Sequence, residues 1–292
     1  MRRFDDCNPI VIAIYLIVTA GIAMLCMNPL LLSLSLIGAL SYYLSRNGSR
    51  GARFHLAALA LFAVTALINP LVSHNGVTVL FVMNDNPVTL EATLYGIVAA
   101  EMIIAVFYWF ALFTQIMTSD KLLYLFGKLS PKLSLVLSMG LRYVPLFGRQ
   151  AKKINNAQRA MGLYKEDNAV DSSRGRIRVF SVLVTWALEN GIVTADSMTA
   201  RGYGLKKRRH FSIFKLRVSD AIILSLTLAL AMLTCACLAL GKLDFEFYPY
   251  VKHAPLTWVS VIGYISYGAL ALLPTFSELE EKLKWKYLKS KI

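Results

Sequence analysis

Two short phrases in the chain place small residues around one long side chain, each at the expected end of a helix. The guanidinium in the second phrase can form a bidentate hydrogen bond with a carboxylate of another protein. Small neighbours let the backbone of such a partner approach closely, so the pattern favours protein docking. A glycine-terminated helix with a solvated arginine explains the same residues equally well. The phrases consist of Gln158, Arg159, Ala160, Met161 and Gly162, and of Ala200, Arg201 and Gly202.

Residues suited to metal binding or catalysis are scattered along the chain. The four histidines lie in separate segments without the spacing of a ligand set, and three of the four cysteines lie in apolar runs. No phosphate loop of the form Gly-x4-Gly-Lys-Ser/Thr occurs, so nucleotide hydrolysis would require another polypeptide. We therefore expect no metal, no cofactor and no enzymatic activity. A membrane-embedded lipid or isoprenoid transferase, which usually needs clustered carboxylates or histidines, stays an alternative.

Long apolar runs must position the two phrases. Hydrophobic residues make up 57% of the chain and the mean hydropathy is +0.55, which predicts an integral membrane protein. No small-residue cleavage pattern separates the first two runs, so we expect two spans there and no cleaved signal peptide. Each run has about the 20 residues needed to cross a bilayer core. The six predicted spans are Pro9–Met27, a run that begins at Pro29, Phe54–Val72, Leu90–Gln115, Asp220–Leu240 and Pro255–Pro274.

The basic residues indicate how these spans are oriented. With the N-terminus in the cytoplasm, segments 1–8, 45–53, 118–219 and 275–292 are internal and hold 29 of the 31 lysines and arginines. This asymmetry predicts a multi-pass protein with both termini in the cytoplasm. The net charge of +14 then belongs mainly to the cytoplasmic face, and nucleic-acid binding is not expected.

Two long amphipathic helices are predicted between the fourth and fifth spans. The first runs from Leu133 to about Ala160, and Ser130-Pro131 before it is typical of a helix start with serine as the cap. A kink or a break is expected near Pro145, because proline cannot donate the helical hydrogen bond. The stretch becomes basic toward its C-terminal half, while one face stays apolar.

The second amphipathic helix is predicted from Arg176 to Thr199, and Gly202 and Gly204 terminate it. Between the two helices, the segment from Lys165 to Ser173 is polar and is expected to form a turn. The predicted fold class is therefore all-α, with about six transmembrane helices and two long helices along the cytoplasmic side. Residues 1–117, 118–219 and 220–292 form the N-terminal bundle, the region of the two long helices, and the C-terminal pair with a basic tail.

Roles are also predicted for several charged residues outside the two phrases. Glu101 lies inside the fourth predicted span, where an ionisable group is costly; a structural hydrogen bond is favoured over a place on a substrate path. Glu189 and Asp196 are close enough in the pattern to pair with arginines of the first long helix, or to stay solvated. The segment Lys282–Lys289 is typical of a basic, aromatic anchor at the headgroups, or of an ordinary helix end.

The order and spacing of several phrases resemble the transmembrane (T) component of energy-coupling factor transporters, a family that includes cobalt-transport permeases. The resemblance covers nearly the whole chain. It is carried by Asn69-Pro70-Leu71, His74-Asn75-Gly76, Asn86-Pro87-Val88-Thr89-Leu90-Glu91, Leu141-Arg142-Tyr143-Val144-Pro145-Leu146-Phe147, Ala157-Gln158 and Ala200-Arg201-Gly202.

The resemblance implies a scaffold in the cell membrane that joins two cytosolic ABC-type ATPases to a small substrate-binding membrane protein (S component) for vitamin or metal-ion uptake. In such proteins, two coupling helices end in Ala-Arg-Gly-like motifs that dock on the ATPases. Here Ala200-Arg201-Gly202 keeps that motif, whereas Met161 stands where the first motif usually has arginine. Arg159 is about 200° away around an ideal helix and cannot simply replace it. Asymmetric docking is therefore expected. The permease of a conventional ABC importer is the remaining alternative.

Overall fold

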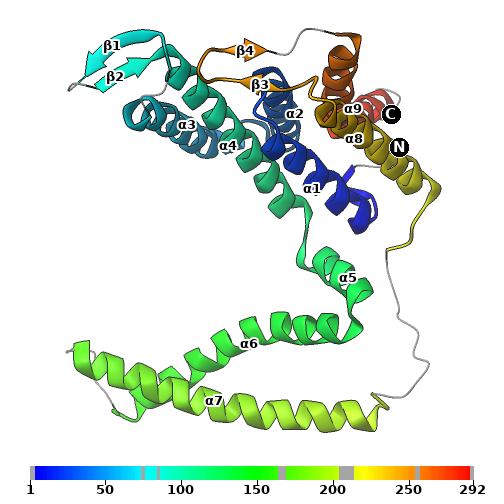
Figure 1. Cartoon of the computed structure of the whole chain (residues 1–292). Helices are drawn as coiled ribbons and strands as arrows, with labels where there is room; N and C mark the ends of the chain where they lie inside the picture. Colours follow the sequence, from blue (N-terminus) through cyan, green and yellow to red (C-terminus); the bar gives the residue numbers. More distant parts are fainter. Residues whose placement is uncertain are drawn as a thin grey trace. The chain divides into compact units, whose positions relative to one another are not determined.

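The computed structural model describes residues 4–73, 76–83, 86–163, 169–203, 214–253 and 257–289. Two compact units divide the chain, one formed by Met1–Leu122 with Phe214–Ile292 and the other by Leu123–Ile213. Helices dominate each unit (Figure 1), which confirms the all-α fold class. In chain order the elements are η1 (Phe4–Asp6), α1 (Pro9–Leu25), α2 (Pro29–Asn47), η2 (Gly48–Gly51), α3 (Ala52–Val72), β1 (Val79–Met83), β2 (Asn86–Thr89), α4 (Leu90–Ile116), α5 (Ser119–Leu129), α6 (Pro131–Ala160), α7 (Ala169–Ala200), α8 (Val218–Ala239), β3 (Phe245–Glu246), β4 (Lys252–His253) and α9 (Trp258–Lys289).

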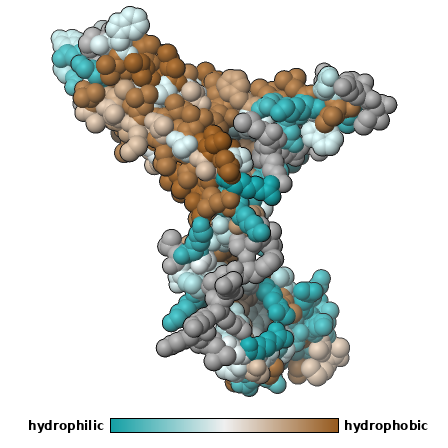
Figure 2. Space-filling model, turned by 90° about the vertical axis from the view of Figure 1, so that its right-hand side faces the viewer, coloured by the Kyte–Doolittle hydropathy of each residue, from teal (hydrophilic) through white to brown (hydrophobic). Residues whose placement is uncertain are grey.

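A helix occurs at each of the six positions predicted to span the membrane. By length and composition, α3, α4, α7, α8 and α9 could each cross a bilayer, and α1 is a shorter apolar helix of 17 residues. Four serines and Arg46 make α2 more polar, and it is not among the five. Apolar residues cover much of the visible face of the unit that holds α1–α4, α8 and α9 (Figure 2). The chain is a multi-pass membrane protein.

Asparagine-proline pairs begin the first two helices. The side chain of Asn8 accepts a hydrogen bond from the Ile10 amide at 3.1 Å, and Asn28 accepts one from the Leu30 amide at 3.0 Å. Proline at the next position needs no amide partner and has a helical φ angle. The short link between α1 and α2 is thus compatible with two separate helices, and Asn28 also donates to the Leu243 carbonyl at 3.0 Å.

The larger unit brings the two ends of the chain together. α4 contacts α1, α2 and α3, while α9 contacts α2 and α8 (Figure 1). Buried aromatic side chains connect these helices, because the indole of Trp109 donates to Ser35 Oγ at 3.0 Å and the Tyr267 hydroxyl donates to the Thr19 carbonyl at 3.2 Å. Hydrogen bonds of this kind satisfy polar groups that lipid cannot.

α9 is longer than the predicted span. It continues through Pro274 to Lys289 as one helix, so the predicted anchor segment Lys282–Lys289 is its last part. Proline at 274 leaves the carbonyl of Leu270 without its helical donor. The Tyr15 hydroxyl of α1 donates to that carbonyl at 2.8 Å. Another helix thus supplies the donor that the Leu270 carbonyl would otherwise lack.

Replacing Tyr15 with phenylalanine tests this contact. The change should lower the free energy of unfolding by about 1–3 kcal/mol, because the buried Leu270 carbonyl would lose its only recorded donor among the described residues. Tyr248→Phe is the matched control, since the Tyr248 hydroxyl is buried without a partner in the described part of the chain. Unfolding in mixed detergent micelles would measure both. Equal effects of the two variants would contradict the assignment.

Two short hairpins were not predicted. β1 pairs with β2 in the link between α3 and α4, with Val79 opposite Thr89 and Phe81 opposite Val88. β3 pairs with β4 in the link between α8 and α9. Segments of two to five residues are too short to produce a clear alternating pattern, so helical periodicity missed them. His74 and Asn75, which belong to the resemblance, lie outside the described residues.

Glu101 lies on α4 and is partly buried. The structure records no hydrogen bond or ion pair for its carboxylate among the described residues, so the predicted structural bond is not seen there. A nearby acidic residue does have such a role. The buried Glu91, at the start of α4, accepts from the amide of Thr78 at 3.3 Å and from the Thr78 hydroxyl. These hydrogen bonds join the residue just before β1 to the start of α4.

Candidate functional site

The first long helix starts and ends where the sequence predicts, but its details differ. α6 begins at Pro131 with Ser130 at the predicted N-cap position, but the side chain of Ser130 makes no capping hydrogen bond. Instead the backbone amide of Ser130 donates to the Phe126 carbonyl at 2.8 Å, because α5 ends directly before it. Of the kink or break expected near Pro145, the break does not occur, since α6 is one helix of 30 residues.

The second long helix is longer than predicted. α7 begins at Ala169, so residues Ala169–Ser173 are helical and the prediction of a turn for them was wrong. Apolar residues such as Val170 extend the helical pattern toward the N-terminus, while the polar composition suggested a turn. Residues 164–168 and Gly204 lie outside the described part of the chain.

Aromatic residues hold α6 and α7 together at one point along their length. The hydroxyls of Tyr143 and Thr194 are hydrogen-bonded at 3.0 Å, and the rings of Phe147 and Trp186 meet edge to face with centroids 6.1 Å apart. Tyr143 and Phe147 belong to the phrase Leu141–Phe147 that supports the resemblance. Among the described ion pairs, none joins Glu189 or Asp196 to α6. The contact between α6 and α7 is instead made by aromatic rings and hydroxyl groups.

The two long helices end in the same backbone geometry. Gly162 and Gly202 have φ angles of +70° and +72°, a left-handed conformation that glycine adopts without strain. At the end of α6, the amide of Gly162 donates to Arg159 O at 3.0 Å and that of Leu163 donates to Gln158 O at 3.2 Å. These two bonds define a Schellman motif.

At the end of α7, the amide of Gly202 donates to Thr199 O at 2.9 Å and that of Tyr203 donates to Met198 O at 3.0 Å. The two motifs therefore correspond residue by residue, with Met161 and Arg201 at the equivalent cap position. α8 ends in the same way at Gly241, where φ is +64°. The geometry alone is therefore common in this chain, and the side chains must provide any docking specificity.

The side chains at the two ends differ in chemistry. Met161 is 66% exposed and Arg201 is exposed, so each cap residue projects outward from its helix end. Gln158 is only 4% exposed and is not available at the surface, although its carbonyl holds the motif together. Arg159 remains in the last turn of α6, which does not unwind to bring it to the position of Met161.

Sequence reasoning missed a basic cavity behind the end of α6. A volume of about 390 Å³ lies between α6 and the first turns of α7. Of the described residues that line it, Lys152, Arg159 and Arg176 are basic, Ser172 carries a hydroxyl, and none is acidic. Lys152 and Arg159 are seven residues apart, a spacing that places both on one helix face, but the contribution of α7 required the fold.

The structure does not bring histidine, cysteine, aspartate and glutamate together as a ligand set. Within the described ranges, no group of three or more of these residues could hold a metal ion. The candidate site therefore consists of the two helix ends, their cap residues and the basic cavity.

The comparison with protein families gives a match that covers the region of these helices. Residues 6–213 match the CbiQ family, described as cobalt transport protein, and this range includes α1–α7 with both helix ends. A search among curated proteins found no match. The match covers more than half of the chain, and the family supplies a membrane component of transport systems that work with ATPase components. This chain belongs to the CbiQ cobalt transport protein family.

Proposed function

We propose that the chain is the coupling subunit of an energy-coupling factor importer, which transmits ATP-driven motion to a small substrate-binding membrane protein. The observation that carries the proposal is the pair of long helices with equivalent ends. α6 and α7 have 30 and 32 residues and bond at an aromatic contact, so motion applied at one end of a helix can be transmitted along it. Two equivalent ends suit a pair of ATPases.

The exposed apolar residues of the long helices support a second partner. These residues recur at helical spacing and would be costly to leave in water. A membrane protein with an apolar surface is the partner that we propose for them. They are Leu133, Val136, Leu141 and Val144 on α6, and Ile177, Phe180, Val184, Leu188 and Ile192 on α7.

Isolation of the tagged chain from a mild detergent, followed by mass spectrometry of bound proteins, tests the proposal. Two ABC-type ATPases and a small substrate-binding membrane protein should co-purify. ATPases with a soluble binding protein would instead favour the permease of a conventional ABC importer. A single chain without ATPases would contradict the proposal and favour a membrane-embedded enzyme. The substrate, a vitamin or a metal ion, would follow from the identity of the small partner.

The two helix ends are proposed to dock differently. Arg201 would form an ionic contact with one ATPase, while Met161 would make an apolar contact with the other. Two different cap residues suit two different grooves.

Met161→Arg tests this asymmetry. The substitution should weaken the first contact about tenfold or more, because a guanidinium would be buried in a groove without its carboxylate. Affinities of each purified ATPase for the chain would measure it, with Leu163→Arg as the control for charge alone beside the same helix end. Tighter binding by the Met161→Arg variant would contradict the apolar contact.

A further inference from the structure

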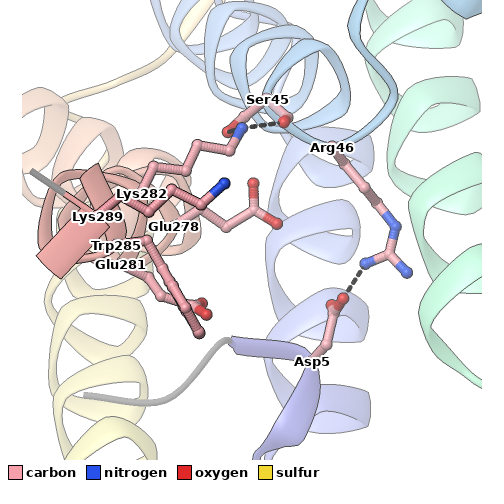
Figure 3. Close-up of a pocket in the computed structure, with 8 residues that line it drawn as sticks. All are labelled: Asp5, Ser45, Arg46, Glu278, Glu281, Lys282, Trp285 and Lys289. Atoms are coloured by element: carbon pink, nitrogen blue, oxygen red, sulfur yellow. Dashed lines mark hydrogen bonds and ion pairs between the residues drawn. The ribbon is translucent and has the colours of Figure 1, made fainter. Parts of the chain in front are cut away.

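A cavity of about 610 Å³ lies in the larger unit, where the end of α9 meets the end of α2 (Figure 3). Its volume is within the range of small-ligand sites, roughly 300–1,000 Å³. It is separate from the helix ends discussed above, so the inference below does not depend on the coupling function. The lining residues are Asp5, Ser45, Arg46, Glu278, Glu281, Lys282, Trp285 and Lys289.

On one side of the cavity, two opposite charges neutralise each other in an ion pair. Arg46 forms an ion pair with Asp5, whose carboxylate also accepts from the Tyr42 hydroxyl at 3.2 Å. On the other side, the ammonium of Lys282 donates to Ser45 Oγ at 2.9 Å and to the Ser45 carbonyl. These contacts hold the ends of α2 and α9 in place around the cavity.

Glu278 is the unusual residue of this site. Only 7% of it is exposed, and its Oε2 atom has no hydrogen-bond partner among the described residues. Figure 3 shows its carboxylate pointing into the space between the Lys282–Ser45 and Arg46–Asp5 pairs. A buried carboxylate oxygen without a donor is costly, so this position suits a ligand that brings a donor or a cation.

The charges of the lining residues indicate which class of ligand the cavity can bind. Among the described residues that line the cavity are three carboxylates and three cationic side chains, so the formal charges of this set cancel. A neutral lining of this kind gives an anion no net attraction, whereas a zwitterion can match both signs. Asp5 and Arg46 neutralise each other. Of the other lining residues, Glu278 can contact a cation, and the ammonium groups of Lys282 and Lys289 can contact an anion.

The position on α9 suits the headgroup layer of a membrane. Glu278, Lys282, Trp285 and Lys289 follow one another at four, three and four residues and therefore share one face of the helix. They lie beyond the apolar part of α9, and tryptophan and lysine are typical of the interface between lipid and water. Leu279 and Leu283 are exposed on the neighbouring face, where acyl chains could lie.

We propose that this cavity binds the headgroup of an aminophospholipid, with the primary ammonium at Glu278 and the phosphate at Lys282 and Lys289. The ammonium supplies the donor that Oε2 lacks. The bound lipid bridges the ends of α2 and α9, which come from opposite parts of the chain.

Native mass spectrometry of the full-length protein in a mild detergent tests the site. Phosphatidylethanolamine, phosphatidylcholine and phosphatidylglycerol with the same acyl chains would be added in equal amounts. Phosphatidylethanolamine should bind about tenfold more tightly than the other two, because the choline group cannot donate hydrogen bonds and glycerol carries no charge. Glu278→Gln should remove this preference. Glu280→Gln is the matched control, since the Glu280 side chain is 44% exposed and pairs with Lys284 outside the cavity.

Two further measurements complete the test. Lys289→Gln should weaken all three phospholipids, and it lies at the exposed end of the helix, so it remains informative if Glu278→Gln does not fold. Soluble glycerophosphoethanolamine distinguishes a lipid from a free phosphate ester. Equal binding of the three lipids to the wild type, an unchanged preference in Glu278→Gln, or tight binding of the soluble ester without enrichment of the lipid would each overturn the proposal.

Discussion

Replacing Arg201 with glutamate is expected to abolish stable binding of one ATPase and, with it, transport. Arg201 is the exposed cap residue of α7, and Gly202 holds the helix end in a fixed Schellman geometry. Reversal of its charge would place two carboxylates together in the proposed contact. Loss of a buried, hydrogen-bonded ion pair costs about 2–5 kcal/mol, which corresponds to a decrease in affinity of about 30-fold to several thousandfold.

Co-purification and the affinity of the purified ATPases would measure this effect. Arg174→Glu is the matched control, because Arg174 is also an exposed arginine of α7 and lies in its N-terminal part, far along the helix from Arg201. Arg201→Lys should give an intermediate affinity, since an ammonium keeps the charge without the bidentate geometry. If Arg201→Glu assembled and transported like the wild type, the assigned role of the second motif would be wrong.

Replacing Gly38 with valine is expected to destabilise the membrane unit by about 1–3 kcal/mol or more. A Cβ atom at this position would lie 2.7 Å from Ala271 Cβ and 2.8 Å from the Ala271 carbonyl oxygen. Backbone atoms cannot move aside as a flexible side chain can, so α2 and α9 would have to separate. Small residues commonly permit such close approach of helices in membranes.

Gly21→Val on α1 is the matched control for this prediction. A Cβ atom at Gly21 would meet nothing within 4 Å, so the same substitution should change stability little. Unfolding of both variants in mixed micelles, with the thermal midpoint in detergent as a second measurement, would compare them. Similar losses of stability would show that the close approach of α2 and α9 is not the cause.

The positions of the helices could be predicted because their signals are local. Apolar runs of about the right length, the Asn8-Pro9 and Asn28-Pro29 starts and the glycines after Ala160 and Ala200 each lie within a few residues of the feature that they determine. The same local signals failed where another part of the chain intervened. Pro274 does not end α9, and Tyr15 donates to the carbonyl that the proline leaves free.

The candidate helix ends were also identified from local residues, including the difference between Met161 and Arg201. The equivalence of their geometry became visible only in the hydrogen bonds of the two Schellman motifs. The basic cavity required Arg176 of α7 beside Lys152 and Arg159 of α6, and no sequence pattern states which faces of two helices will meet.

Local sequence patterns thus located the six apolar helices and the C-terminal ends of the two long helices, but not α5, the first residues of α7 or the extension of α9. Only the tertiary structure decided that α9 packs against α2, that Ala271 touches Gly38, and that Glu278 is buried beside Lys282 and Arg46. These features differ in how far apart in the chain the interacting residues lie. Helix formation depends on neighbours three or four residues apart, whereas packing depends on the shapes of side chains more than two hundred residues apart in the chain.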